Sequence, residues 1–452
     1  MTSLKIIFLL VGDLASLYVS LIGALFIRYG GGFSRELVEH HLIPFSLIFA
    51  VWILLFYTAG LYDLRKLRNG LEFFKTLLLA FTANALVTIM LFYLIPFFGI
   101  APKTNLFIFL GLFAVLEALW RRIWNNLMAG KEAPNKFILI GEGRNAEELR
   151  ELVTHNPQLG YELKEWVPHS SALLHDAPAG LQALCAGHAA NLVVVDDELK
   201  ETPSFSKELY QLFKNGIEVK GLSSTYELLL KKVPLENIRE NWVIDNISGQ
   251  AQFYDSLKRS MEIVAALLLG IVLLPLELLV AVLILLTSPT GPAVCAQTRT
   301  GFRGKTYTHY KFRTMRSCHE KEQNGPQWKT VLEGKVADPR LTAFGRLLVH
   351  THLDELPQLI NILKGEMSFV GPRPERPQFV EMLREKLPYY DVRHMVKPGV
   401  TGWAQVNYRY AASVADTSEK LSYDLYYVKN RSLILDLAIV LKTLKTLFIT
   451  PR

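Results

Sequence analysis

Residues 261–287 read MEIVAALLLGIVLLPLELLVAVLILLT, an apolar run that carries only two charges, Glu262 and Glu277. The run is long enough to cross a bilayer core, which needs about 20 apolar residues. Pro275 lies near its middle. A proline inside a helix removes a hydrogen bond and clashes with the preceding turn, so we expect a bend there. Glu277 is also costly inside hydrocarbon. The run therefore predicts a re-entrant membrane helical hairpin over residues 261–287, broken at Pro275.

The residues that flank this run support the hairpin. Lys258 and Arg259 precede it, and a hairpin keeps both at the anionic membrane surface. Residues 297–452 follow it and are rich in polar motifs suited to phosphate chemistry. Because nucleotide-activated substrates are cytoplasmic, a run that returns to the same face keeps these motifs beside their substrates.

Four more apolar runs occur in the first third of the chain, near residues 5–27, 42–61, 73–98 and 105–124. Their lengths are typical of membrane-spanning helices rather than of the buried core helices of a soluble protein, which is the alternative. Lys and Arg are frequent between the second and third runs and after the fourth, and cytoplasmic loops have this bias. We therefore predict a four-helix transmembrane region over residues 1–130, with the N-terminus and everything after residue 124 in the cytoplasm.

The composition limits the possible partners. The chain has 452 residues, too many for one ordinary domain, and a formal net charge of +7. Such an excess suits nucleic acid, a membrane surface or phosphate-bearing substrates, and the long apolar runs favour the last two. We expect no nucleic-acid partner. The three cysteines, Cys185, Cys295 and Cys318, are scattered and form no Cys-x-x-Cys motif, so we expect neither a disulfide framework nor a zinc site.

Residues 131–250 have the pattern of a soluble α/β domain. Lys136-Phe-Ile-Leu-Ile-Gly141 reads as a buried strand that enters a glycine turn, and residues 191–196 and 216–222 read as two more strands. Glu147-Glu-Leu-Arg-Glu-Leu-Val153 has a helical pattern. Strands that alternate with helices predict a parallel sheet, so we predict a Rossmann-like α/β domain here.

The glycine turn of this domain has two interpretations. Gly141-Glu-Gly-Arg-Asn-Ala146 matches the G-x-G-x-x-G/A turn of dinucleotide-binding folds, and an acidic residue follows at Glu162 or Glu165. The turn indicates either nucleotide binding or a Rossmann-like fold used for assembly. A dehydrogenase-type Tyr-x-x-x-Lys occurs only as Tyr307–Lys311, beyond the apolar hairpin.

An acidic pair stands out in Thr351-His-Leu-Asp-Glu-Leu-Pro-Gln-Leu-Ile-Asn-Ile-Leu363. A proline such as Pro357 is well tolerated in a helix only in the first turn. Asp354 and Glu355 are therefore expected at or just before a helix N-terminus. Adjacent helical residues point about 100° apart, so the pair suits two roles better than one shared proton. An acidic pair at such a position is often only a helix cap. A transition-metal site at His350, His352 and Asp354 is an alternative that no further His or Cys supports.

Cations occur on both sides of the acidic pair in the sequence. They lie in Lys311-Phe-Arg313-Thr-Met, Asp338-Pro-Arg340, Gly345-Arg346 and Gly371-Pro-Arg373-Pro. The planar guanidinium of Arg suits a bidentate grip on phosphate. The prolines around Arg373 stiffen its backbone, so Arg373 is the cation least typical of a solvated surface.

These motifs, in this order, resemble those of the bacterial sugar transferase family, the polyprenyl-phosphate sugar-1-phosphate transferases or monotopic phosphoglycosyl transferases. Beside the motifs above, the resemblance rests on Leu353-Asp-Glu-Leu-Pro-Gln, Lys364-Gly-Glu-Met-Ser-Phe-Val-Gly-Pro-Arg-Pro, Lys397-Pro-Gly-Val-Thr-Gly-Trp-Ala-Gln-Val-Asn and Tyr423-Asp-Leu-Tyr-Tyr-Val-Lys-Asn. The upstream regions are similar to those of the large members, which start exopolysaccharide or O-antigen repeat units. One departure is Glu262, near the place where the family usually has Asp.

The resemblance implies a phosphotransferase reaction. A sugar-1-phosphate, with a hexose expected, would pass from a UDP-sugar to undecaprenyl phosphate, and UMP would be released. Asp354 resembles the nucleophile that forms an aspartyl-phosphosugar intermediate, and Glu355 resembles its supporting acid. Mg²⁺ held by Asp354 and Glu355 would neutralise the diphosphate.

The resemblance also implies the binding residues and the location. Phosphate and UDP-sugar binding is expected at Arg373, Lys311, Arg313, Arg340, Arg346, Lys397 and Gln405. Lys258 and Arg259 are expected to guide the lipid phosphate. We expect the mainly helical catalytic domain, residues 251–452, on the cytoplasmic face of the bacterial inner membrane. A homodimer held by the Rossmann-like domain is a further expectation.

Two other functions remain open from the sequence. A membrane-anchored, NAD-dependent sugar-nucleotide dehydratase also pairs four membrane helices with a Rossmann domain, and NAD bound to the purified protein would favour it. A non-enzymatic polysaccharide assembly factor is the other, and it predicts no loss of activity when Asp354 is replaced.

Overall fold

The structure is a computed structural model of the chain. It describes all residues except 1, 63–70, 95–102, 130–134, 169–177, 248–251, 290, 319–339, 409–412 and 450–452. Asp338 and the basic connection after the second apolar run lie outside the described residues. The chain divides into two compact units, Met1–Leu222 and Ser223–Arg452.

The first unit begins with the four predicted helices, α1 (Thr2–Tyr29), α2 (Arg35–Ala59), α3 (Leu71–Leu94) and α4 (Lys103–Ala129). In the described part of the chain, the helices long and apolar enough to cross a membrane are α1, α2, α3 and α11 (Gln252–Thr287). The helix α4 forms as predicted but is not among them, because Glu117, Arg121 and Arg122 make it more polar.

Buried ion pairs explain how α4 packs in spite of its charges. Arg121 is fully buried and donates to Asp13 of α1 (Nη2–Oδ2 2.5 Å) and to Glu117 (Nε–Oε1 2.8 Å). Tyr62 and Trp120 donate to the same Asp13 carboxylate (2.5 and 3.1 Å). Charges are tolerated in an apolar environment only when they are paired. Asp13, which interrupts the first apolar run, therefore joins α1 to α4.

The α/β part of the first unit contains the predicted parallel sheet, with one strand more than predicted. Its strands are β1 (Asn135–Ile140), β2 (Tyr161–Val167), β3 (Leu192–Val195) and β4 (Glu218–Gly221), in the order β2-β1-β3-β4. All three pairings are parallel. The prediction missed β2 because it is an edge strand that carries Glu162, Lys164 and Glu165 and is only partly buried.

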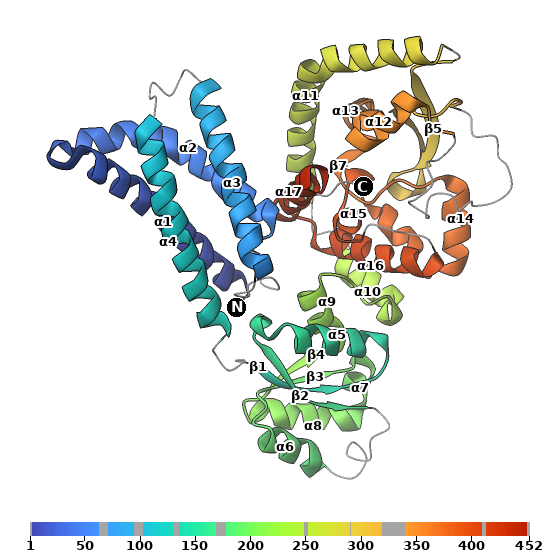
Figure 1. The fold of residues 1–452 in the computed structure, drawn as a ribbon. Helices are drawn as coiled ribbons and strands as arrows, with labels where there is room; N and C mark the ends of the chain where they lie inside the picture. Colours follow the sequence, from blue (N-terminus) through green and yellow to red (C-terminus); the bar gives the residue numbers. More distant parts are fainter. Residues whose placement is uncertain are drawn as a thin grey trace. The chain divides into compact units, whose positions relative to one another are not determined.

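Helices cover both faces of this sheet. The helix α5 (Arg144–His155) lies on one face, and α6 (Pro178–Gly187) and α8 (Pro203–Lys214) lie on the other (Figure 1). The side chains of α6 and α8 pack on alternate residues of β1 and β3, among them Ile138 and Val193. The short helix α7 (Asp197–Glu201) follows β3.

The second unit begins earlier than the predicted boundary near residue 250. Its first helices are α9 (Leu222–Leu230) and α10 (Glu240–Ile247). The segment around them belongs to this unit because Val233 and Ile238 pack in one core with Leu421 and Leu425 of α16 (Val414–Asn430). Trp403 also donates to Lys231 O (2.8 Å).

The remaining elements of the second unit are short and mainly helical, as predicted. The helices are α12 (Ala343–Thr351), α13 (Gln358–Lys364), α14 (Pro377–Lys386), α15 (Trp403–Asn407) and α17 (Leu433–Ile449). The strands β5 (Val294–Thr300) and β6 (Thr306–Phe312) form an antiparallel hairpin, and β7 (Ser368–Val370) and β8 (Gly399–Thr401) form a parallel pair.

The long apolar run forms α11, one continuous helix with Pro275 inside it rather than two helices with a break. Figure 1 shows α11 as two arms that meet at a marked angle. Both arms pack on the same unit: Ala266 lies against Ile362 and Met367, and Val280 and Ile284 lie in a core with Phe312. The predicted bend is therefore present, without a break in the helix.

A disulfide joins Cys295 and Cys318 in this structure. The sequence predicts no disulfide framework, and this single bond forms because the fold brings the two residues to a Cα–Cα distance of 5.3 Å although they are 23 positions apart. The sequence spacing alone carries no signal for this proximity. Cys185 is free and buried in the α/β core.

Candidate active site

The acidic pair lies where the sequence predicts it, directly before a helix. The helix α12 ends at Thr351, and His352 adopts a left-handed conformation (φ 57°) that turns the chain. A short 3₁₀ turn, Leu353–Glu355, then carries both acids, and Pro357 leads into α13. Asp354 is 8% exposed. The turn therefore presents two adjacent carboxylates, and one of them is almost completely removed from water.

Two of the predicted cations meet this pair. Lys311 Nζ of β6 lies 2.9 Å from Glu355 Oε1 and 3.8 Å from Asp354 Oδ2. Arg373 Nη2 lies 3.5 Å from the same Glu355 oxygen. Glu355 therefore lies between two cations, whereas Asp354 has only the more distant contact with Lys311. The two acids are adjacent in the sequence but not equivalent in their surroundings.

This asymmetry separates the pKa values of the two carboxyl groups. Burial alone would raise the pKa of Glu355, but Arg373 and Lys311 outweigh burial and lower it to about 2. Burial raises the pKa of Asp354 and the Glu355 charge adds to this, against the opposing effects of Lys311 and Arg373. Glu355 is thus a permanent anion, and Asp354 is the more basic and more nucleophilic of the two.

A tight backbone contact fixes the loop that carries Arg373. A Cβ added to Gly371 would lie 2.9 Å from Gly399 N, and one added to Gly399 would lie 2.1 Å from Gly371 N, so both positions require glycine. Buried Arg393 donates from Nη2 to Arg373 O (2.9 Å) and from Nε to Asp424 Oδ2 (3.0 Å). The sequence does not predict that Arg393 supports the backbone of Arg373. The Gly-Pro-Arg-Pro and Lys-Pro-Gly motifs therefore act together to hold Arg373 beside Glu355.

Other predicted phosphate-binding residues have contacts elsewhere. The Arg313 guanidinium donates to Ser288 O and so fastens the end of α11. Arg346 is exposed on α12, and the carbonyl of Arg340 accepts from Arg316 N (3.1 Å). Gln405 donates to Val400 O (3.1 Å). These contacts of Arg313, Arg340 and Gln405 are with the backbone. In the described part of the chain, only Lys311 and Arg373 of the predicted set form ion pairs with the acids.

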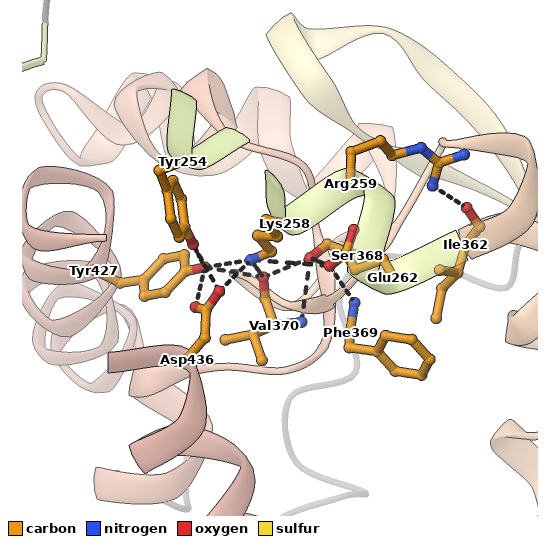
Figure 2. A network of polar contacts seen from close by, with 10 residues as sticks. All are labelled: Tyr254, Lys258, Arg259, Glu262, Ile362, Ser368, Phe369, Val370, Tyr427 and Asp436. Atoms are coloured by element: carbon orange, nitrogen blue, oxygen red, sulfur yellow. Dashed lines mark hydrogen bonds and ion pairs between the residues drawn. The ribbon is translucent and has the colours of Figure 1, made fainter. Parts of the chain in front are cut away.

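The basic pair at the start of α11 anchors this helix to the second unit. Figure 2 shows Lys258 Nζ among Val370 O (2.8 Å), the Tyr427 hydroxyl (2.8 Å) and Asp436 Oδ2 (3.0 Å). Arg259 donates to Ile362 O and Leu363 O (2.6 and 2.8 Å) at the end of α13. The ammonium of Lys258 therefore has hydrogen-bond and ion-pair partners within the protein. Its position is explained by these contacts without a lipid phosphate.

Glu262 has a structural role on the same helix. Its Oε1 accepts hydrogen bonds from the Ser368 hydroxyl and from Phe369 N (3.1 Å), both in β7 (Figure 2). Ser368 and the end of β7 directly precede the Gly371 loop. The start of α11 is thus coupled through β7 to the loop that carries Arg373.

One polar face of the β5–β6 hairpin was not predicted from the sequence. The register pairs Arg299 with Tyr307 and Gln297 with His309, so these residues and Lys311 lie on one face. Arg299 Nε, Tyr307 OH and His309 Nδ1 are buried without a hydrogen-bond partner among the described residues. Burial, with Lys311 and Arg299 nearby, lowers the pKa of His309 to about 3, so its ring is neutral at physiological pH. Alternation within residues 306–312 is the signal that would have found this face.

The acidic pair fits a magnesium ion better than a transition metal. In the described part of the chain no three His, Cys, Asp or Glu side chains come together as metal ligands, so the site considered for His350, His352 and Asp354 is not assembled there. Magnesium usually takes one or two carboxylates and completes its shell with water and substrate phosphates. Asp354 and Glu355 suit that role when a diphosphate is bound.

The glycine turn of the α/β sheet has an acidic neighbour. Gly141 (φ 153°) follows β1, and a Cβ added to it would lie 3.3 Å from the Asp196 side chain. The indole of Trp166 donates to Gly141 O (2.7 Å). The two acids considered for ribose binding pair with Lys164 and His188. A carboxylate beside the turn disfavours a pyrophosphate there.

Apolar helices and a buried acidic pair between two cations define a membrane-bound protein with an enzyme-like site. The model of the family described as bacterial sugar transferase matches residues 253–450. The chain is 40% identical over 231 residues to a UDP-N-acetylgalactosamine-undecaprenyl-phosphate N-acetylgalactosaminephosphotransferase from Aeromonas hydrophila (51% of this chain, 52% of that protein). Two UDP-glucose:undecaprenyl-phosphate glucose-1-phosphate transferases are also similar. The protein from Escherichia coli K12 is 32% identical over 297 residues (64% and 60%), and the one from Caulobacter vibrioides is 40% identical over 202 residues (44% and 72%).

The chain belongs to the bacterial sugar transferase family. It spans about half the length of the relatives from Aeromonas hydrophila and Escherichia coli. The matched segments contain the acidic pair, Lys311 and Arg373, so the residues that meet in the site are those in the family region.

Proposed function

We propose that this protein transfers a sugar-1-phosphate, with a hexose expected, from a UDP-sugar to undecaprenyl phosphate and releases UMP. Such a step would begin the synthesis of an exopolysaccharide or O-antigen repeat unit. One observation carries the proposal: Lys311 and Arg373 divide the acidic pair into a permanent anion, Glu355, and a buried, more basic carboxylate, Asp354. The names of the relatives, which include glucose and N-acetylgalactosamine phosphate transferases, support the same reaction class.

The reaction divides into two displacements at one phosphorus atom. In the first, an Asp354 oxygen forms a bond to the β-phosphorus of the UDP-sugar, and the bond from this phosphorus to the bridging oxygen breaks, so UMP leaves with the electron pair. In the second, a phosphate oxygen of undecaprenyl phosphate attacks the same phosphorus, and the Asp354 carboxylate is released. The low exposure of Asp354 protects the acyl phosphate from water between the two steps.

The surrounding charges have separate tasks in this proposal. Arg373 stabilises the negative charge that develops on the transferring phosphoryl oxygens. Lys311 holds Glu355 in place and favours the ionised form of Asp354. Magnesium bound by Asp354 and Glu355 would neutralise the diphosphate charge. The face of Arg299, Tyr307 and His309 includes polar atoms without a hydrogen-bond partner among the described residues, and these atoms would bind the rest of the donor.

The pH dependence of UMP release is expected to follow Asp354. Because the nucleophile must be ionised and burial raises its pKa, activity should be lost as the pH falls through a value above 3.8. Lys311 lowers the pKa of Asp354, so Lys311→Met should move this acid limb to higher pH, besides reducing the rate. The measurement is the pH profile of kcat/KM for both proteins. A matched variant at exposed Lys386, Lys386→Met, should leave the limb in place. An unchanged limb in Lys311→Met would count against Asp354 as the titrating nucleophile.

We also propose that α11 enters and leaves the same face of the bacterial inner membrane and that the second unit is cytoplasmic. This rests on the bend at Pro275 and on the packing of both arms against one unit. A straight helix that crosses the membrane would separate its ends by the bilayer thickness of about 30 Å and expose one of them to the other side.

Cysteine labelling tests this topology. In a variant without Cys185, Cys295 and Cys318, a single cysteine at exposed Asn430 should react with an impermeant thiol reagent only after the cells are permeabilised. A single cysteine at exposed Gly31, between α1 and α2, should react on intact cells. Labelling of Asn430→Cys from outside would overturn the re-entrant arrangement.

The two alternative functions have weaker support. A dehydratase needs its Tyr-x-x-x-Lys beside a nicotinamide, whereas Tyr307 and Lys311 lie on β6 and Lys311 forms an ion pair with Glu355. A non-enzymatic assembly factor does not require a buried acidic pair whose two pKa values differ, so this feature favours an enzyme. A homodimer of the full chain stays a prediction, which sedimentation of the purified protein would test.

A further inference from the structure

The Cys295–Cys318 disulfide lies on the same face of the β5–β6 hairpin as a lysine of the candidate active site. Cys295 belongs to β5, and Cys318 follows β6, so the bond encloses the hairpin. The register pairs Cys295 directly with Lys311, which lies 2.9 Å from Glu355. Residues directly opposite in an antiparallel pair project from the same face, with Cβ atoms about 4.5–5.5 Å apart. The disulfide is therefore a close neighbour of the lysine that contacts the acidic pair.

The segment that carries Cys318 also supports the start of α12. Thr342 caps α12, and its backbone N donates to Thr314 O (3.0 Å). A Cβ added to Gly345 would lie 1.9 Å from Thr314 O, so the first turn of α12 packs directly on the backbone of this segment. Residues 314–318 therefore connect the disulfide to the beginning of α12.

The helix α12 leads directly to the acidic pair, which lies in the turn after its last residue. Leu348 of α12 and Leu353 of that turn pack in one core with Phe312 of β6. The site thus has two sides, Lys311 on the hairpin and the acids after α12. Because the disulfide joins the hairpin to the segment on which α12 packs, it restrains these two sides relative to each other.

The proposed location of the second unit makes this bond reversible. Disulfides are rare in the reducing cytoplasm, and those that form there are usually transient and redox-sensing. Both cysteines belong to the second unit, which is the unit proposed to be cytoplasmic. Cys318 is half-buried, so a small oxidant can reach its sulfur, whereas Cys295 is 7% exposed. Cys185 is free and buried in the α/β core of the first unit. It therefore serves as an internal reference thiol.

We propose that Cys295 and Cys318 form a thiol–disulfide switch that sets how firmly the acidic pair is held against Lys311. The disulfide form holds the site in the arrangement described above, and the dithiol form loosens it and slows catalysis. This goes beyond the transfer reaction, and it rests on the cytoplasmic placement of the second unit in the proposed function.

Hydrogen peroxide supplies the oxidising equivalents for the switch. One thiolate attacks a peroxide oxygen, the O–O bond breaks, and a sulfenic acid and hydroxide result. The second thiolate then attacks that sulfur and displaces hydroxide, which forms the S–S bond. The two thiol protons neutralise the two hydroxides, so two thiols and one peroxide give one disulfide and two water molecules. Exchange with a small thiol such as glutathione returns the dithiol.

Hydrogen–deuterium exchange of the purified full chain tests the switch without any substrate. The experiment compares protein treated with dithiothreitol and protein treated with stoichiometric hydrogen peroxide. Labelling with a maleimide should detect three thiols in the first and only Cys185 in the second. Amides of residues 343–355 should exchange about tenfold more slowly in the oxidised protein, since a disulfide restricts the open states of the segments that it joins. UMP release should be several-fold faster in the same form.

Two matched variants assign the response to this pair. Cys318→Ser should exchange like the reduced wild type under both treatments, and Cys185→Ser should keep the full difference. Three free thiols after peroxide, equal exchange in the two forms, or a difference that persists in Cys318→Ser would overturn the proposal. Equal rates of UMP release in the two forms would overturn it as well.

Thiol trapping in acid-quenched cells tests the switch in place. The pair should be reduced in unstressed cells and bonded after exposure to peroxide. A bond already complete in unstressed cells would overturn the switch and identify a permanent crosslink. If neither form released UMP while the exchange difference remained, only the proposed transfer reaction would fail.

Discussion

Asp354→Asn should abolish the release of UMP from a UDP-sugar in the presence of undecaprenyl phosphate. The amide has nearly the shape of the carboxylate but lacks its charge and cannot form the phosphoryl bond. Activity should fall to the uncatalysed background, a larger loss than removal of any single binding residue would cause. The measurement is the rate of UMP formation by chromatography, with purified wild-type and variant proteins at equal concentration.

A matched control separates chemistry from folding. Asp391→Asn makes the same change at a half-exposed acid that pairs with Arg384 on the surface, and such pairs contribute little to stability. This variant should keep wild-type activity. Substantial UMP release by Asp354→Asn would exclude a covalent role for this residue. If the wild type itself released no UMP, the non-enzymatic assembly function would be favoured.

Arg373→Ala should reduce kcat by about 10²–10³-fold, the usual effect of removing one group that stabilises developing charge. The loss has a second cause, because Arg373 also lowers the pKa of Glu355 and keeps it ionised. Arg373→Lys should recover only part of the rate, since an ammonium cannot bind two phosphoryl oxygens in a bidentate manner. The measurement is kcat and KM for the UDP-sugar under saturating lipid.

The control for this prediction is Arg384→Ala, which removes an exposed arginine of α14 that pairs with Asp391. It should leave kcat unchanged. If Arg373→Ala raised KM but left kcat intact, the residue would bind the ground state only, and its assignment to the transferring phosphate would be wrong.

The acidic pair lies directly before a helix, as the sequence predicts, because local rules decide this placement. Pro357 limits where a helix can begin, and the prolines beside Arg373 limit the conformation of its loop. Pro275 likewise predicted the bend in α11. These features depend on the conformational preferences of one or two residues, so no tertiary information was needed.

The roles of the other basic residues could not be predicted, because they depend on contacts between distant segments. Arg313 and Lys258 were assigned to phosphates, yet one fastens the end of α11 and the other joins its start to β7 and α17. Lys397 lines a cavity whose wall does not include the acidic pair. A basic side chain in a motif-rich region has the same appearance in the sequence whether it binds a ligand or a backbone carbonyl.

In the proposed reaction, the sugar leaves the donor together with its phosphate. A UDP-sugar labelled with ³²P at the β-phosphate tests this most directly, in an assay with the full chain, Mg²⁺ and undecaprenyl phosphate. The label should appear in the lipid product, and the released nucleotide should be unlabelled UMP. Chelation of Mg²⁺ by EDTA should stop both. Release of the label as UDP, with an unlabelled sugar on the lipid, would contradict phosphosugar transfer and indicate an ordinary glycosyl transfer.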